Sequence, residues 1–118
     1  MKIKTVVLSI IIILAASGLS ACAERKKISE VTADPGRYAN KEVTIVGKVT
    51  NSYGALNYGV FEIDDGTGRM WVVTEKYGVP SKGTYIGVSG KIVPGVTYQG
   101  RNYGTGMYES ERRTRESR

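Results

Sequence analysis

The residue types that support acid–base or nucleophilic catalysis are scarce in this chain. Its 118 residues include no histidine and a single cysteine, Cys22. Histidine is the side chain whose ordinary pKa best suits proton transfer near neutral pH. No pair of carboxylates has a spacing that argues for acid–base work, and no glycine-rich stretch leads into a helix as a phosphate-binding loop does. We therefore predict a protein that is not an enzyme and that uses no cofactor and no metal.

Aromatic and basic side chains are the better candidates for a functional site. Trp71 stands two residues after Arg69, so both side chains lie on the same side of a strand. An exposed indole beside a guanidinium is a platform on which a nucleic-acid base can stack, and each stacked base contributes about 1–3 kcal/mol. The alternative is that Trp71 only covers the sheet or packs under the N-terminal segment. The full set of candidate ligand-binding residues is Lys48, Tyr53, Tyr58, Arg69, Trp71, Lys91 and Tyr98.

Acidic residues lie in the same part of the chain. Glu62, Asp64 and Asp65 would repel phosphate groups if they faced the same groove. The run Asp64–Gly68 also resembles a calcium loop in having two adjacent carboxylates. It lacks the alternating carboxylates and the terminal glutamate of an EF-hand, so we interpret it as a turn.

The stretch from Tyr58 to Thr74 positions these side chains, and its pattern predicts a β-hairpin. Apolar residues alternate with polar ones on both sides of the run Asp65–Gly68, which has the composition of a tight turn. The expected inward residues are Phe61, Ile63, Met70 and Val72, which leaves Glu62, Arg69, Trp71 and Val73 on the outer face.

The rest of the chain is expected to wrap one small barrel around this hairpin. Strands are predicted over Glu42–Thr50 and Thr84–Val93, and a fifth lies within Arg101–Tyr108. Gly47 and Gly90 mark sharp bends, because a glycine leaves room for the neighbouring strand at a barrel corner. Polar loops are expected over Asn51–Asn57, Glu75–Gly83 and Pro94–Gly100.

A short helical segment is predicted before the first strand, over Ser29–Tyr38. Ser29 is a candidate N-cap, and Asp34-Pro35-Gly36 breaks the helix. This segment is expected to plug one end of the barrel with its apolar residues Ile28, Val31 and Tyr38. At the other terminus, residues 109–118 are almost wholly charged or polar and are expected to be disordered.

Three runs of sequence resemble the OB-fold family. They are Val43–Val49, Phe61–Gly68 and Ile86–Ile92, and the resemblance covers roughly residues 40–108. It looks most like the nucleic-acid-binding OB domains of tRNA-binding and helicase-associated proteins. It implies an all-β, five-stranded Greek-key barrel whose second and third strands and flanking loops form the ligand groove. One departure is that Glu75–Gly83 is too short and too rich in helix breakers for the helix that the family often has there.

The N-terminus has the organisation of a targeting segment. Lys2 and Lys4 precede an apolar run, Val6–Ala16, which is far shorter than the roughly twenty residues of a membrane-spanning helix. The run Leu19-Ser20-Ala21-Cys22 resembles the lipobox of bacterial lipoproteins. That family implies cleavage before Cys22 and acylation of its thiol. The alternative is an ordinary secretory signal.

The resulting organisation is a signal peptide over 1–21, a lipid-anchored tether over 22–27, a barrel over 28–108 and a tail over 109–118. Cleavage removes two lysines and no acidic residue, so the net charge falls from +6 to +4. Two or three acyl chains anchor a protein stably. The expected location is the outside of a bacterial membrane. Ala23 follows the cysteine where an aspartate would signal inner-membrane retention, so a two-membrane source implies the outer membrane.

Three functions remain open for such a chain. The first is an envelope-anchored, non-enzymatic OB-fold module that binds single-stranded nucleic acid or another polyanion. The second is a module that binds an envelope protein or a glycan. The third is a structural lipoprotein without a ligand, for which Trp71 would be buried. An OB-fold by itself does not choose among them.

Overall fold

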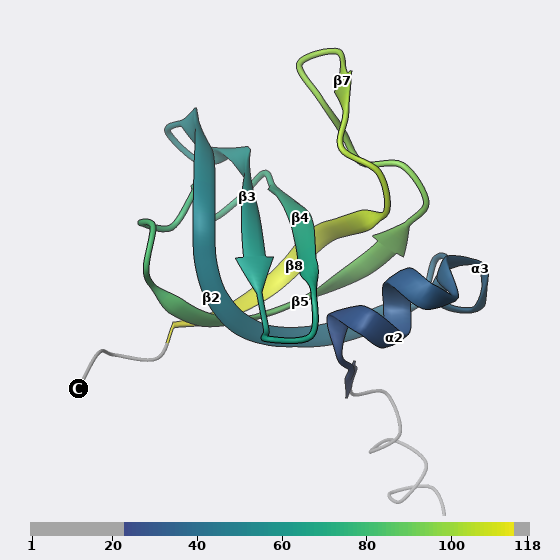
Figure 1. Ribbon diagram of the computed structural model, residues 1–118. Helices are drawn as coiled ribbons and strands as arrows, with labels where there is room; N and C mark the ends of the chain where they lie inside the picture. The colour runs from purple at the N-terminus through teal and green to yellow at the C-terminus, as the bar shows by residue number, and fades with distance from the viewer. Residues whose placement is uncertain (1–22, 115–118) are drawn as a thin grey trace, which may run out of the picture.

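Five strands pair into a ring in the computed structural model, which describes residues 23–114 (Figure 1). Their order is β2–β3–β4–β8–β5, and β5 closes back onto β2. The β4–β8 pair is parallel and the other four pairs of the ring are antiparallel. The predicted five-stranded barrel is therefore confirmed. The barrel strands are β2 (Glu42–Ala55), β3 (Tyr58–Asp64), β4 (Arg69–Thr74), β5 (Tyr85–Val93) and β8 (Gly106–Thr114).

Shorter elements lie outside the ring. Helices α2 (Ile28–Ala33) and α3 (Pro35–Tyr38) lie at the lower end of the barrel in Figure 1, and β7 (Arg101–Asn102) lies at the upper end. The remaining two are β1 (Glu24–Arg25), which pairs with β2, and β6 (Thr97–Tyr98), which pairs with β7. Within residues 23–114, no helix is both long enough and apolar enough to cross a bilayer.

Strand β2 closes the barrel because it pairs with β5 along its first half and with β3 along its second half. The bend falls at Gly47, where an added Cβ would overlap the backbone carbonyl of Asp64. Gly90 on β5 is equally crowded, since a Cβ there would overlap the carbonyl of Tyr108. Both predicted bends are thus confirmed as positions where strands approach too closely for a side chain.

The predicted loop over Asn51–Asn57 is wrong for most of its length. β2 continues through Ala55, and only Leu56 and Asn57 form the turn into β3. A register shift between Val49 and Asn51 marks a bulge that lets the strand carry on after its bend. Residues 51–55 therefore form part of a strand because they pair with β3, although their polar composition is typical of a loop.

The main core fills the barrel interior with the alternate residues that the hairpin pattern predicts. Phe61, Ile63, Met70 and Val72 are all at most 1% exposed. The helical segment plugs the lower end as expected. The residues that it contributes to this core are Ile28, Val31 and Tyr38, all of them buried.

Helix α2 is capped by the β3–β4 turn. Its N-cap is Lys27, not Ser29 as predicted. The N–H of Ile28 donates to Asp65 Oδ2 at 2.8 Å, and the N–H of Ser29 donates to Thr67 Oγ1 at 3.1 Å. Helix N-termini leave such N–H groups without an intrahelical partner, so the turn supplies what the local sequence does not.

The predicted disordered tail is wrong over residues 109–114, which continue strand β8; residues 115–118 lie outside the described part of the chain. The fifth strand is Gly106–Thr114, and not within Arg101–Tyr108 as expected. Two of its charged side chains pair with each other: Arg112 Nη2 lies 2.8 Å from Glu109 Oε1, with both side chains at most 10% exposed. Arg112 also donates to the carbonyl of Gly78 at 2.7 Å.

The predicted tether over 22–27 is wrong in its described part. Glu24 pairs with Val43 and Arg25 pairs with Thr44 in a short parallel ladder. The N–H of Lys26 then donates to the carbonyl of Thr44 at 2.9 Å. Cys22 itself lies outside the described residues. The residues that follow it, Glu24 to Lys26, are held against the barrel by these backbone contacts.

Asp65 should make stability depend on pH. Burial raises the pKa of its carboxyl, but hydrogen bonds from Thr67 Oγ1 and from the N–H groups of Ile28, Thr67 and Gly68 outweigh burial, so the pKa is lowered below its usual 3.8. A lowered folded-state pKa adds stability above the unfolded pKa, and this stability is lost as the pH falls through the folded pKa. Asp65→Asn should lower the free energy of unfolding at pH 7 by about 1 kcal/mol, the scale of a helix cap.

Urea denaturation of both proteins from pH 7 down to pH 2 would test this, with the fluorescence of Trp71, the sole tryptophan, as the signal. The gap between Asp65→Asn and the unmodified protein should close as the pH falls below about 4. Asp34→Asn is the control, because no hydrogen bond to the Asp34 side chain is found in the described structure. A gap that stays constant with pH would contradict the role of the carboxylate.

The Glu109–Arg112 pair gives a second test of stability. Arg112→Ala removes the partner of a buried carboxylate and should cost about 3–5 kcal/mol. The double variant Glu109→Leu/Arg112→Leu should recover most of that loss, because apolar residues often replace a buried ion pair at little cost. Equal urea midpoints for Arg112→Ala and the unmodified protein would show that this end of the barrel does not need the pair.

Candidate functional site

Three aromatic rings are in contact on the outer face of the barrel. Tyr53 on β2 stacks on Trp71 of β4, with ring centroids 5.9 Å apart and an interplanar angle of 23°. The ring of Tyr103, which follows β7, also contacts Trp71, with centroids 4.8 Å apart and an interplanar angle of 48°. Tyr53 is 53% exposed, and Trp71 and Tyr103 are half-buried. We call these three residues the aromatic row.

The pattern of the hairpin places this row. Trp71 lies directly opposite Glu62, and Val73 lies opposite Val60, so all four point away from the core as expected. Tyr53 joins them because β2 continues past its bulge and pairs with Val60. The strand extension that the sequence misses is thus what brings Tyr53 to Trp71.

The outer face is partly covered by the chain itself. The segment 94–104 forms a second hairpin, whose base is closed by two hydrogen bonds of 2.8 Å between Val96 and its partners Gly104 and Tyr103. Val96 packs on Val60 and Val73 in a small second core, where all three are at most 2% exposed. The predicted open groove over this ribbon is therefore wrong for the half that carries Val60 and Val73.

Tyr98 belongs to this cover and not to a ligand-binding loop. It is 7% exposed within the second core, and its ring lies 5.2 Å from that of Tyr58. Tyr58 is 45% exposed and remains accessible. Tyr98 is therefore a packing residue, and its prediction as a ligand contact is corrected.

The acidic residues near the row form hydrogen bonds and ion pairs with neighbouring side chains. Glu62 accepts hydrogen bonds from Thr50 Oγ1 at 2.8 Å and Asn51 Nδ2 at 2.9 Å. Arg69 lies 3.9 Å from Glu62 and 3.3 Å from Asp64, so the expected cation beside Trp71 is paired with both carboxylates. The charges next to the row are nearly balanced, and the repulsion expected from the acids is offset.

Lys48 and Lys91 are exposed but lie away from the row. Lys48 pairs with Asp64, at the end of the ribbon nearest the β3–β4 turn. Lys91 is on β5, where its neighbours in register are Glu42 and Tyr108. The structure therefore brings together Tyr53, Arg69 and Trp71 of the predicted set, with Tyr58 nearby, and leaves the two lysines outside.

Two residues of the site were not expected from the sequence. Tyr103 completes the row, and the guanidinium of Arg101 lies 5.5 Å from the centre of its ring. Both were assigned to a fifth strand, so they were not considered as part of a loop. The only signal was the tyrosine- and glycine-rich composition of residues 98–106.

The run Asp64–Gly68 is a turn, as the sequence indicates. Asp64 accepts the N–H of Gly66 at 2.8 Å, and Asp65 accepts the N–H of Thr67 at 2.9 Å. Within residues 23–114, no three histidine, cysteine or acidic side chains are grouped so that they could hold a metal ion.

Searches with protein-family models found no match to this chain, and no curated protein matches it. Solved structures do match its fold. An OBody bound to hen egg-white lysozyme is 16% identical, over 66% of this chain and 84% of that chain, with a TM-score of 0.51. A putative aspartyl-tRNA synthetase from Leishmania major Friedlin is 10% identical, with a TM-score of 0.61; the match covers 80% of this chain and about a fifth (21%) of that one.

A replication protein A heterotrimer bound to single-stranded DNA is a third match, at 19% identity over 64% of this chain and 58% of that chain, with a TM-score of 0.48. At such identities the first two matches, whose TM-scores are above 0.5, support the fold alone. Residues 23–114 thus have the OB-fold, with an extra N-terminal strand, and the ligand has to be argued from the site.

Stability measurements should separate packing aromatics from site aromatics. Tyr98→Ala empties a buried position and should lower the free energy of unfolding by about 3 kcal/mol or more. Tyr53→Ala removes an exposed ring with one stacking partner and should cost less than about 1.5 kcal/mol. Urea denaturation followed by Trp71 fluorescence gives both values. A larger loss for Tyr53→Ala would mean that the row is part of the core.

Proposed function

We propose that this protein is a lipid-anchored, non-enzymatic OB-fold binding module of the bacterial cell envelope. In this proposal the aromatic row stacks on bases of single-stranded nucleic acid. The lipobox-like run ending at Cys22 supports the anchor, and the scarcity of catalytic residue types supports a role in binding. The observation on which the ligand proposal depends is the aromatic row, in which Tyr53 and Tyr103 from separate segments both contact Trp71 and all three rings are partly exposed.

Two arginines flank the row and supply contacts for phosphates. Arg101 lies over the ring of Tyr103, and Arg69 stands two residues from Trp71 on β4. Arg69 is 61% exposed in spite of its ion pairs, so its guanidinium remains accessible to a second anion. In proteins that bind single strands, bases commonly stack on aromatic rings while basic side chains contact the phosphates.

A glycan of the envelope is the second candidate, and the near balance of charge around the row favours it. Glu62 and Asp64 together offset Arg69, which leaves Arg101 as the unpaired cation among the described residues near the row. Sugar rings pack their apolar faces on tyrosine and tryptophan without needing a net positive surface. Salt dependence distinguishes the two ligands, because only phosphate contacts release counterions.

Titration with an oligothymidylate tests the proposal, and Trp71 reports it directly because it is the sole tryptophan. Stacking should quench its fluorescence, and two arginine–phosphate contacts should give a slope of log K against log salt of about −1.4. Tyr53→Ala should weaken binding about 5- to 150-fold, the equivalent of one stacked base.

Tyr85→Ala is the matched control, because Tyr85 is 56% exposed but lies on β5, away from the row. It should bind the oligonucleotide like the unmodified protein. Equal losses in the two variants, or no quenching at low salt, would contradict the nucleic-acid proposal. Quenching by a chitooligosaccharide that does not change with salt and is lost in Tyr53→Ala would favour the glycan.

A further inference from the structure

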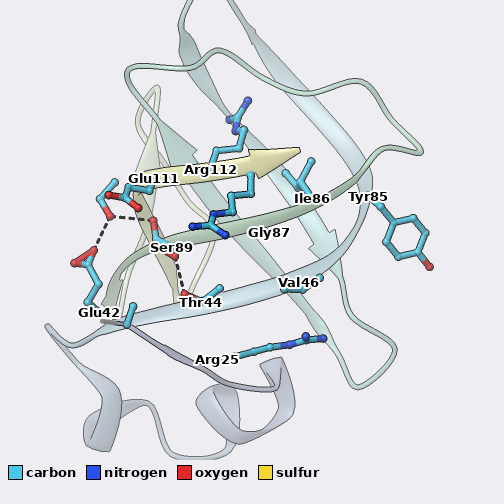
Figure 2. A pocket seen from close by; sticks show the side chains of 13 residues that line it. Arg25, Glu42, Thr44, Val46, Tyr85, Ile86, Gly87, Ser89, Glu111 and Arg112 are labelled. Carbon is cyan, nitrogen blue, oxygen red and sulfur yellow. Dashed lines mark hydrogen bonds between the residues drawn. The ribbon is translucent and has the colours of Figure 1, made fainter. Parts of the chain in front are cut away.

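A groove lies on the side of the barrel that carries β1, β5 and β8, away from the aromatic row (Figure 2). It has a volume of about 820 Å³ and is open to solvent. Its floor is formed by β2 and β5, where Val46 lies beside Gly87 and the hydroxyls of Thr44 and Ser89 are hydrogen-bonded to each other. Charged and aromatic side chains surround this floor. We call it the basal groove and define it by Arg25, Val46, Tyr85, Gly87 and Arg113.

The first described residue lies in the wall of this groove. Ala23 lines it, and the β1 ladder then fixes Arg25 opposite Thr44 on β2. Since consecutive Cα atoms are about 3.8 Å apart, a residue at position 22 can lie only that far from Ala23. An acyl chain on Cys22 would therefore hold the basal groove at the bilayer, with no flexible tether between them.

The side chains around the groove suit the headgroup region of a bilayer. Arg25 and Arg113 are exposed, and neither has an ion pair within the described residues. Tyr85 is 56% exposed at one end, where it pairs in register with the exposed Lys48. Arginine, lysine and tyrosine are the residues that settle at membrane interfaces, where cations meet anionic headgroups.

Glu42 and Glu111 match Arg25 and Arg113 in number, so the excess of positive charge around the groove comes from the exposed Lys48 beside Tyr85. Glu42 accepts a hydrogen bond from Ser110 Oγ at 2.6 Å, which Figure 2 shows at the edge of the groove. Glu111 is exposed on β8, beside Ser89. Arg25 also lines a smaller adjoining hollow, in which Lys26 and Lys27 stand with the acids Glu30 and Asp65, and Lys26 pairs with Glu24 at 3.0 Å.

We propose that the basal groove is a membrane-contacting face, which rests on anionic phospholipid headgroups and sets the orientation of the barrel. The proposal rests on the acylation of Cys22 in the proposed function. In this orientation β1 lies next to the bilayer, whereas the β6–β7 hairpin at the opposite end of Figure 1 points away from it. The aromatic row is then presented to the surroundings of the membrane and not to its lipids.

Fluorescence quenching on vesicles measures this orientation. The acylated protein is placed on vesicles of phosphatidylcholine and phosphatidylglycerol that contain a lipid with a nitroxide headgroup. Cys22 is the sole cysteine, so a cysteine introduced elsewhere is labelled alone once Cys22 is acylated. A fluorophore at Glu111→Cys should be quenched several-fold more than one at Thr97→Cys on β6. Equal quenching at the two positions, or stronger quenching at Thr97→Cys, would overturn the proposal.

Charge reversal tests whether the arginines of the basal groove cause this orientation of the barrel. In Arg25→Glu/Arg113→Glu the difference in quenching between Glu111→Cys and Thr97→Cys should become smaller, although the acyl chain still holds this side of the barrel near the bilayer. Lys76→Glu/Lys82→Glu carries the same change of charge on exposed residues outside the groove, and it should leave the difference intact. Vesicles of phosphatidylcholine alone should also reduce the difference. A difference that persists undiminished after reversal at the groove would overturn a role for headgroup charge.

Flotation of the vesicles separates this proposal from its premise. A protein that floats, and that no longer does so after Cys22→Ser, has the lipid anchor, and the quenching result then decides the orientation alone. A protein that does not float overturns both the anchor and the membrane-contacting face. Oligothymidylate binding by the aromatic row is independent of either result.

Discussion

The carboxylate of Asp65 joins the two parts of the chain on which the fold depends. It accepts N–H groups of its own turn and also the N–H of Ile28, which begins the helix that plugs the barrel. A six-residue helix is too short to be stable by itself, so packing and capping from outside must hold it. Because α2 directly follows β1, the same contact also limits where the N-terminal strand can lie. The hairpin turn therefore fixes the end of the barrel and the route by which the chain enters it.

Local patterns in the sequence were sufficient for the central ribbon of the barrel and for its bends. Alternation around the Asp65–Gly68 turn predicted which side of the β3–β4 ribbon faces the core, and Gly47 and Gly90 marked the bends. Each of these features depends on residues within one strand or one turn, so it can be read without knowing the partner strand. The plug was predicted for a similar reason, since Ile28 and Val31 are the main buried apolar residues within residues 23–37.

Most of the features that the sequence did not predict depend on pairing or packing with other strands. Residues 109–114 have the composition of a disordered tail, yet Glu109 and Arg112 neutralise each other and β8 pairs with both β4 and β5. The 94–104 hairpin resembles a polar loop until Val96 is seen to pack on Val60 and Val73. Composition measures what a segment can bury by itself, whereas these segments bury what the rest of the barrel offers them.

The covered half of the ribbon also explains why the site is a row and not a broad groove. The 94–104 hairpin removes Val60, Val73 and Tyr98 from solvent, but the same hairpin delivers Tyr103 to Trp71. In the proposed function a ligand meets three rings held in place by packing, so little ordering of side chains is left for binding to accomplish. On the other side of the barrel, β1 places Arg25 in the wall of the basal groove, close to the point where the chain enters the domain. One small barrel thus keeps its two charged and aromatic surfaces apart, because β2 bends at Gly47 and contributes its first half to one and its second half to the other.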